Sequence, residues 1–216
     1  MENRKLGELR ERIEDAFSDY YEKAGGWEYR QHHLKRTKKY AEKLMDSDEI
    51  EQKNFDPEAV RIAALFHDIG RKEDIDDGEL DPMAKHEEHA GKGAEIIEDE
   101  IGDMVKDERL ELIRQIVENH HSEPELVETM IVQDADDLGK FSTIDIWRLV
   151  HYAAENQRTL KETFDYFFNE LKPQNEQLIE QMNFEASKKA ARKRLKRYTE
   201  TMKTMRKEAE GEDIDG

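Results

Sequence analysis

The 216-residue chain contains no cysteine, which excludes both disulfide bonds and thiolate metal sites. It also has no run of about 18 apolar residues, so no segment is predicted to span a membrane. Its first residues, MENRKLGELRERIEDAF, lack the apolar stretch of a signal peptide. We therefore expect a soluble, cytoplasmic protein.

Several well-known enzyme signatures are missing as well. The chain has no G-x-x-x-x-G-K-[ST] phosphate-binding loop, no G-x-G-x-x-G dinucleotide fingerprint and no G-x-S-x-G nucleophile elbow. These absences argue against a P-loop NTPase, a Rossmann-type dinucleotide enzyme and a serine α/β-hydrolase.

Apolar residues are scarce. Hydrophobic residues make up 36% of the chain and charged residues 41%, whereas soluble proteins average roughly 25% charged residues. This composition fits long polar helices around one modest core, although disordered chains can share it. The regular spacing of the apolar residues favours a folded protein over most of the length.

Acidic residues outnumber basic ones by 53 to 35, which gives a formal net charge of −18. A surface this acidic repels phosphates, so we expect no nucleic-acid partner. The basic stretch 188–197 is bracketed by acidic residues and is interpreted as a solvated helix face. The sequence leaves two interpretations of the acidity open: adaptation to a salt-rich cytoplasm in a halophilic source, or simply an acidic soluble protein.

Helical periodicity is nearly continuous and predicts an all-α fold. An N-terminal helix is expected over residues 1–25. Further helical segments are expected at about 27–45, 60–66, 83–101, 107–120, 125–134, 141–155, 174–182 and 185–208, with a frayed tail over 209–216. The short apolar run 130–132 is interpreted as a buried helical turn rather than a strand.

The four prolines are all interpreted as helix starters. Pro57 and Pro82 each follow an aspartate that can cap a helix N-terminus, and Pro124 and Pro173 open later segments in a similar way. Gly70 is interpreted as the stop signal after the apolar stretch 60–66.

Most of the eight histidines occur in helical contexts, and His67-Asp68 is the sharpest feature among them. This pair ends an apolar stretch, where burying a charged pair would be costly. A divalent metal ion bound by both side chains would remove that cost, because neutral histidine and ionised aspartate suit borderline divalent ions. The competing interpretation is a helix C-terminus with an exposed aspartate, but aspartate is unfavourable at the negative end of the helix dipole. A metal site is therefore favoured.

Three segments, taken in order, resemble the motifs of the HD-domain metal-dependent phosphohydrolase superfamily. They are His33-Leu34-Lys35-Arg36, the stretch 63–70 (AALFHDIG) and Asp134-Ala135-Asp136. The resemblance covers about residues 27–155, and the stretch 182–205 is similar to the C-terminal helix of small stand-alone HD hydrolases. It implies an N-terminal helix over 1–25, an HD-domain helical bundle with a buried metal site over 26–157, and C-terminal helices over 158–216 that pack on the core.

The resemblance also implies a ligand set. His33, His67, Asp68 and Asp136 would hold a first divalent ion, whether Mn, Fe, Co, Ni, Zn or Mg. Asp136 is preferred to Asp134 because the superfamily places alanine just before the ligand.

A second ion is implied by the middle of the chain. His89 lies in a segment, HAGKG, that is similar to the H-x-x-x-G segment of binuclear members, and His120-His121 resemble the paired histidines that complete their second site. Asp68 would then bridge the two ions. One alternative stays open: in a one-metal site, the same three histidines would contact the substrate phosphate.

The implied activity is hydrolysis of a phosphate ester in a small, nucleotide-like substrate. Asp68 or Asp136 would orient the attacking water, and Arg71 or Lys72 would neutralise a phosphate oxygen, although both can equally be solvated loop charges. Arg71 stands where the cyclic-dinucleotide phosphodiesterases of this superfamily have lysine, and 122–124 (SEP) replaces their G-Y-P segment, so that substrate class is not favoured.

Two other functions stay open. A di-iron oxygenase can use the same histidine and aspartate set, and an inactive binding module can retain the fold. A homo-oligomer is also compatible with the sequence.

Overall fold

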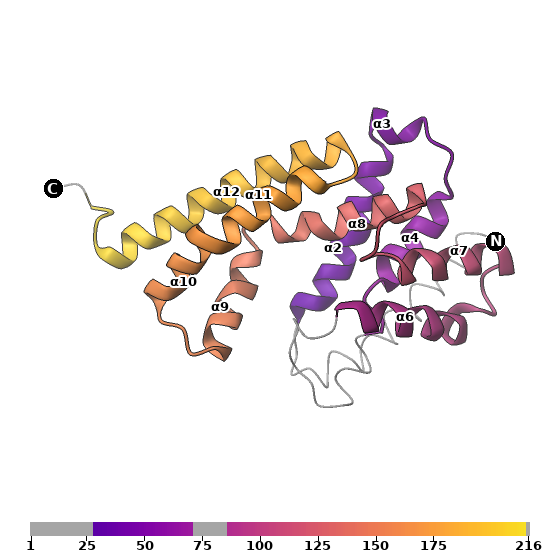
Figure 1. Ribbon diagram of the computed structural model, residues 1–216, viewed down its shortest axis with the longest axis horizontal. Helices are drawn as coiled ribbons and strands as arrows, with labels where there is room; N and C mark the ends of the chain where they lie inside the picture. Colours follow the sequence, from indigo (N-terminus) through magenta and orange to yellow (C-terminus); the bar gives the residue numbers. More distant parts are fainter. Residues whose placement is uncertain (1–27, 71–85, 215–216) are drawn as a thin grey trace. The chain divides into compact units, whose positions relative to one another are not determined.

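A computed structural model of the chain describes residues 28–70 and 86–214 (Figure 1). All regular elements within these residues are helical, which confirms the all-α prediction. The chain divides into two compact units, Met1–Asp136 and Asp137–Gly216. The predicted helix over 1–25 and the residues Pro82, Arg71 and Lys72 lie outside the described residues.

Within its described residues, the first unit contains five complete helices and most of a sixth. They are α2 (Glu28–Met45), α3 (Asp48–Glu51), α4 (Pro57–Phe66), α6 (His86–Ile101), α7 (Asp107–Glu118) and α8 (Val127–Lys140). α8 includes the run 130–132, so its interpretation as a helical turn is correct. The boundary between the two units falls within α8, whereas the sequence places the end of the HD bundle at residue 157.

Helix α4 lies at the centre of this unit and packs against both α2 and α7. Most of its side chains are buried, including Val60, Ile62 and Phe66, as its apolar sequence predicts. The helix begins as expected: Asp56 accepts hydrogen bonds from the backbone N–H groups of Glu58 and Ala59, with Pro57 in the first turn. Because α4 is surrounded, the residues at its C-terminal end are held inside the bundle.

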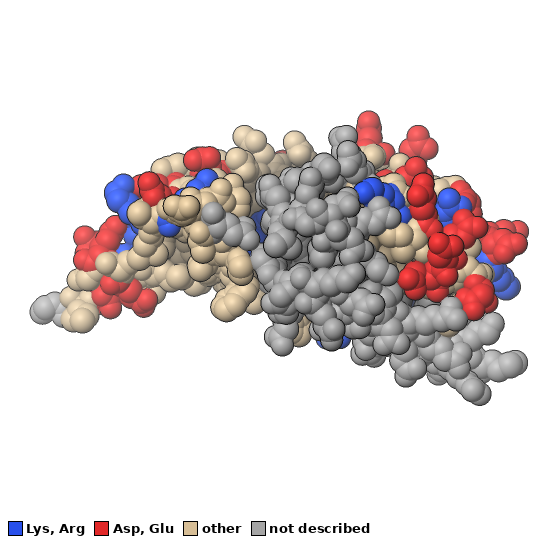
Figure 2. Space-filling model, turned by 90° about the horizontal axis from the view of Figure 1, so that it is seen from below, with Lys and Arg blue, Asp and Glu red and all other residues tan. Residues whose placement is uncertain are grey.

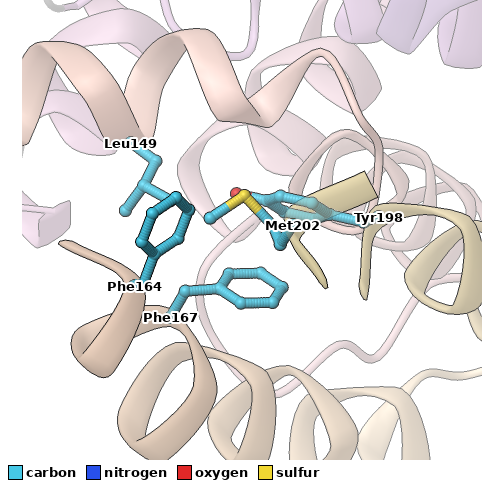
Figure 3. Packing of buried hydrophobic residues seen from close by; sticks show 5 residues of the cluster. All are labelled: Leu149, Phe164, Phe167, Tyr198 and Met202. Atoms are coloured by element: carbon cyan, nitrogen blue, oxygen red, sulfur yellow. The ribbon is translucent and has the colours of Figure 1, made fainter. Parts of the chain in front are cut away.

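The second unit consists of the last residues of α8 followed by further helices. They are α9 (Asp145–Glu155), α10 (Leu160–Tyr166), the π-helical turn η1 (Phe167–Leu171), α11 (Lys172–Gln181) and α12 (Glu185–Glu210). Its core includes Leu149, Phe164, Phe167, Tyr198 and Met202, which converge from α9, α10, η1 and α12 (Figure 3). This cluster gives the unit an apolar centre of its own.

Pro173 lies in the first turn of α11, as expected of a helix starter, but the chain is already helical before it, from Leu160 through η1. Proline lacks the N–H needed for the usual i→i−4 bond. In the preceding π-turn the Lys172 N–H donates to the carbonyl of Phe167, five residues back, and such one-turn insertions can occur within otherwise regular helices. Pro124 also differs from expectation, since α8 begins three residues after it, at Val127.

Two glycines have roles that differ from the predicted ones. Gly70 was expected to stop the preceding helix, but α4 ends at Phe66 and Gly70 has no left-handed backbone conformation. Its role, described below, is close packing against α6. Gly211 does adopt the left-handed conformation, with φ of 70°, and ends α12. Ala209 and Glu210, expected in the frayed tail, therefore still belong to α12.

Charge is divided unequally between the two units. Residues 1–136 contain 20 basic and 38 acidic residues, whereas residues 137–216 contain 15 of each. The whole net charge of −18 thus belongs to the first unit. In Figure 2, acidic side chains outnumber basic ones on the part of the first unit's described surface that faces the viewer.

Among the described helices, none is both long enough and apolar enough to cross a membrane.

Candidate metal centre

The first group of polar residues gathers at the C-terminal end of α4. His67 and Asp68 occupy the turn that follows α4, His33 comes from α2 and Asp136 from α8. His33 Nε2 lies 3.1 Å from Asp136 Oδ1 and 3.2 Å from His67 Nε2. His67 Nε2 lies 3.5 Å from the same Asp136 oxygen. Four side chains from three segments far apart in sequence therefore point at one small volume.

His67 is fully buried, and its orientation is set by the backbone. Its Nδ1 donates to the carbonyl oxygen of Ala64, 2.9 Å away, in the last turn of α4. A carbonyl can only accept, so this bond places a proton on Nδ1, and in the neutral ring the Nε2 lone pair faces His33 and Asp136. Burial alone would lower the pKa of His67, but the carboxylates of Asp68 and Asp136 raise it above its ordinary value.

Asp68 joins this group to a second one through its two carboxylate oxygens. Its Oδ2 lies 3.7 Å from His33 Nε2 and 3.8 Å from His67 Nε2. Its Oδ1 faces the other way and lies 3.3 Å from Nε2 of His89 on α6. Each oxygen of one carboxylate thus faces a different set of histidines.

The second group is completed by the two histidines after α7. His121 Nε2 lies 3.3 Å from His89 Nε2. His120 stacks edge-on against His67 and His89, with ring centroids 5.4 Å apart in both pairs. Ligand atoms of Asp68, His89, His120 and His121 all lie within 4.8 Å of one another, as do those of His33, His67 and Asp68.

His120 carries a buried nitrogen with no partner among the described residues. Its Nδ1 donates to the Val117 carbonyl, as in His67, while its buried Nε2 makes no hydrogen bond. Leaving such a nitrogen unsatisfied is costly unless something else binds it. Burial and the neighbouring His121 and His67 hold the pKa of His120 well below its ordinary value, so the ring is neutral and able to coordinate a cation.

The donor set therefore fits divalent metal ions. It consists of imidazoles and carboxylates, and neutral imidazole and ionised carboxylate suit borderline divalent cations such as Mn²⁺, Fe²⁺, Co²⁺, Ni²⁺ and Zn²⁺. Two imidazoles have their other nitrogen tied to backbone carbonyls, an arrangement that is typical of metal-ligating histidines. His67, His89 and His120 are buried, whereas His121 is exposed.

Comparison with known families supplies the context for this cluster. The HD domain family model matches residues 30–139, which is just over half of the chain. The chain belongs to the HD domain family. A comparison with curated proteins found no match.

Solved structures of HD proteins share the fold. A predicted HD superfamily hydrolase from an uncultured Thermotogales bacterium is 22% identical, with a TM-score of 0.63 and coverage of 94% of this chain and 92% of that one. An HD-superfamily hydrolase from Bacillus thuringiensis is also 22% identical, with a TM-score of 0.63 and coverage of 95% and 98%. Bacillus subtilis YpgQ, in complex with ADP, is 19% identical, with a TM-score of 0.64 and coverage of 100% and 97%.

The structure of this HD domain brings together all the described residues that the sequence singled out as ligands. These are His33, His67, Asp68, His89, His120, His121 and Asp136. Asp134 is also buried, but it is Asp136 that carries the oxygen facing His33 and His67. His32 is exposed, and His151 lies in the second unit. That these residues bind metal stays a prediction.

Sequence reasoning missed the residues that orient the histidines. The carbonyls of Ala64 and Val117 each lie three residues before the histidine that they hold. The only sequence signal for this arrangement is that His67 and His120 each occur at the C-terminal end of a helix, where backbone carbonyls lack intrahelical partners.

Proposed function

We propose that this HD-domain protein is a metal-dependent phosphohydrolase that cleaves a phosphate ester of a nucleotide-like substrate. The observation that carries the proposal is the division of the Asp68 carboxylate between two histidine groups, together with the buried and unpartnered Nε2 of His120. The ADP bound to YpgQ, a protein of the same fold, supports a nucleotide-like substrate.

Each group would hold one divalent ion. His33, His67 and Asp136 would bind the first, His89, His120 and His121 the second, and Asp68 would contribute one oxygen to each. Bound divalent ions supply Lewis acidity and lower the pKa of water to near neutrality. Hydrogen bonds to backbone carbonyls fix the ring orientations of two of the buried histidines, His67 and His120.

The residues at the rim would meet the substrate. His121 is exposed, and 15% of the Asp68 side-chain surface is accessible to solvent. In a one-metal site, His121 would instead contact a phosphate oxygen. The Asp68 carboxylate would accept a hydrogen bond from the attacking water and orient it. Arg71 and Lys72, which follow directly on Gly70, remain candidates for neutralising phosphate charge.

A metal-by-substrate screen tests this proposal. The apo-protein is loaded with Mn²⁺, Fe²⁺, Co²⁺, Ni²⁺, Zn²⁺ or Mg²⁺ and assayed against nucleoside mono-, di- and triphosphates, cyclic dinucleotides and p-nitrophenyl phosphate. We expect phosphate release from at least one nucleotide, with one or two ions bound per chain by elemental analysis. Because Asp68 faces both groups, Asp68→Ala should abolish activity and remove most of the metal.

Asp99→Ala is the matched control, because Asp99 is an exposed aspartate on α6. It should retain wild-type metal content and activity. Absence of tightly bound metal under every loading condition would overturn the proposal. So would an iron-loaded protein that consumes O₂ and hydrolyses none of the substrates, since that result indicates an oxygenase.

A further inference from the structure

Gly70 allows the turn after α4 to touch α6. A Cβ atom on Gly70 would lie 1.9 Å from the carbonyl oxygen of His89 and 2.7 Å from the backbone nitrogen of Gly93. Both distances are far inside van der Waals contact, and both neighbours are backbone atoms that cannot rotate away. The present separation of the turn and α6 therefore requires glycine at position 70.

Gly93 faces the same contact from α6. A Cβ there would lie 3.3 Å from the Gly70 nitrogen, 3.3 Å from Ile69 Cγ2 and 3.2 Å from Val117 Cγ1. These distances are only slightly too short, so alanine at 93 requires a shift of a few tenths of an ångström. Gly91, two residues earlier on α6, has no such neighbour within 4 Å.

The segments that meet at Gly93 also carry residues of the second group. Gly93 lies one helical turn after His89, and Gly70 lies two residues after Asp68. Val117 precedes His120 by three residues, and its carbonyl accepts the hydrogen bond from His120 Nδ1. The segments in contact at Gly93 are thus the ones that carry Asp68, His89 and His120.

We infer that Gly70 and Gly93 are positioning residues that set the distance between Asp68 and His89, and thereby the affinity of the second group for its ion. This inference rests on the proposed metal-dependent function. The first group should be much less sensitive to a change at Gly93, because His33 and Asp136 come from α2 and α8 and not from α6. Gly70 follows His67 and Asp68 in the same turn, so a change there also bears on the first group.

A graded series of alanine variants tests the inference. Gly91→Ala, Gly93→Ala and Gly70→Ala add the same methyl group with no, slight and severe crowding, respectively. Metal stoichiometry and the two stepwise dissociation constants are measured by Mn²⁺ titration of the apo-protein with calorimetry. Circular dichroism and the melting temperature in EDTA report whether each variant is folded.

We expect Gly91→Ala to bind two ions as the wild type does. Gly93→Ala should weaken the second ion about 10–100-fold, which is the usual size of effect for residues that orient ligands, with the first ion nearly unchanged. Gly70→Ala should retain one ion; if it fails to fold, Gly93→Ala decides the question. A purely structural role would lower the melting temperature without changing the ratio of the two affinities.

The outcomes separate this inference from the proposed function. If the wild type binds two ions and Gly93→Ala binds both with unchanged affinity, the positioning role is wrong and the hydrolase proposal stands. If the wild type binds only one ion, the positioning role is likewise wrong and the hydrolase proposal still stands. If the wild type binds no divalent ion under any condition, the proposed function fails as well.

Discussion

At the scale of single residues, the choice between Asp134 and Asp136 shows how finely the site depends on helix geometry. Both side chains are buried on α8, but positions two apart on a helix differ by about 200° in direction. Asp136 Oδ1 lies 3.1 Å from His33 Nε2 and 3.5 Å from His67 Nε2, so Asp136 has an oxygen close enough to share an ion with both histidines.

The two aspartates should therefore respond differently to substitution. We expect Asp136→Ala to remove the first ion and most of the activity, because it deletes a direct ligand. Asp134→Ala should leave both ions bound and reduce activity by at most about 10–100-fold, as changes beyond the ligands do. Elemental analysis and steady-state kinetics of the two variants measure this. Loss of metal in Asp134→Ala with retention in Asp136→Ala would show that the ligand register is wrong by two residues.

At the scale of the elements, the start of α4 is tied to two other helices through Asp56. Its carboxylate caps α4 and lies 2.6 Å from Nε of Arg109 on α7, while its backbone N–H donates to Glu128 on α8. Burial would raise the pKa of Asp56, but the hydrogen bonds from Arg109 and from the backbone of α4 lower it below its ordinary value. The charged form therefore stabilises the fold.

The lowered pKa of Asp56 makes its contribution to the free energy of unfolding depend on pH. A carboxylate with a lowered pKa stabilises the folded state above its unfolded pKa of about 3.8–3.9, and this contribution disappears as pH falls through the folded pKa. Asp56→Ala should lower the free energy of unfolding by about 1 kcal/mol at pH 7, mainly through loss of the cap. Asp56→Asn preserves a capping oxygen and isolates the charge.

Urea unfolding of the wild type, Asp56→Ala and Asp56→Asn between pH 2.5 and pH 7 measures the contributions of the cap and of the charge. The difference between wild type and Asp56→Asn should be largest at neutral pH and should shrink below about pH 4. Arg109→Ala serves as the control for the ion pair alone and should cost under about 1 kcal/mol, because the Arg109 side chain is 42% exposed. A difference that grows as pH falls would contradict the prediction.

At the scale of the whole molecule, the two units differ in charge, and salt should therefore act on them differently. The first unit carries the whole net charge of −18 and the second is neutral overall. Repulsion among like charges destabilises a compact unit, and salt weakens it as the Debye length falls from about 10 Å at 0.1 M to about 3 Å at 1 M.

We predict that KCl stabilises the first unit selectively between 0.1 and 1 M. The melting temperature should rise, and hydrogen exchange measured by mass spectrometry should slow in peptides from α4 and α7. Peptides from α10 and α12 provide the internal control and should change much less. Equal slowing in both units, or none in the first, would show that charge repulsion does not limit its stability.

The all-α class, the start of α4 at Asp56-Pro57 and the identities of the clustered histidines and aspartates could all be predicted from the amino-acid sequence. These features are encoded locally, in apolar spacing, in a capping residue beside a proline, and in short motifs that occur in order. The order of the motifs was enough to indicate the family.

The arrangement of these residues depends on the packing of the helices and could not be predicted in the same way. The sequence contains no measure of which oxygen of Asp68 faces which histidine, since that depends on how α2, α6 and the turn after α4 approach one another. It indicated a helix stop at Gly70, where the structure shows a backbone contact with His89, because one glycine can serve either purpose. It indicated a helix start at Pro173, and Pro173 does lie in the first turn of α11, but it did not indicate that α10, η1 and α11 follow one another without a break from Leu160 to Gln181.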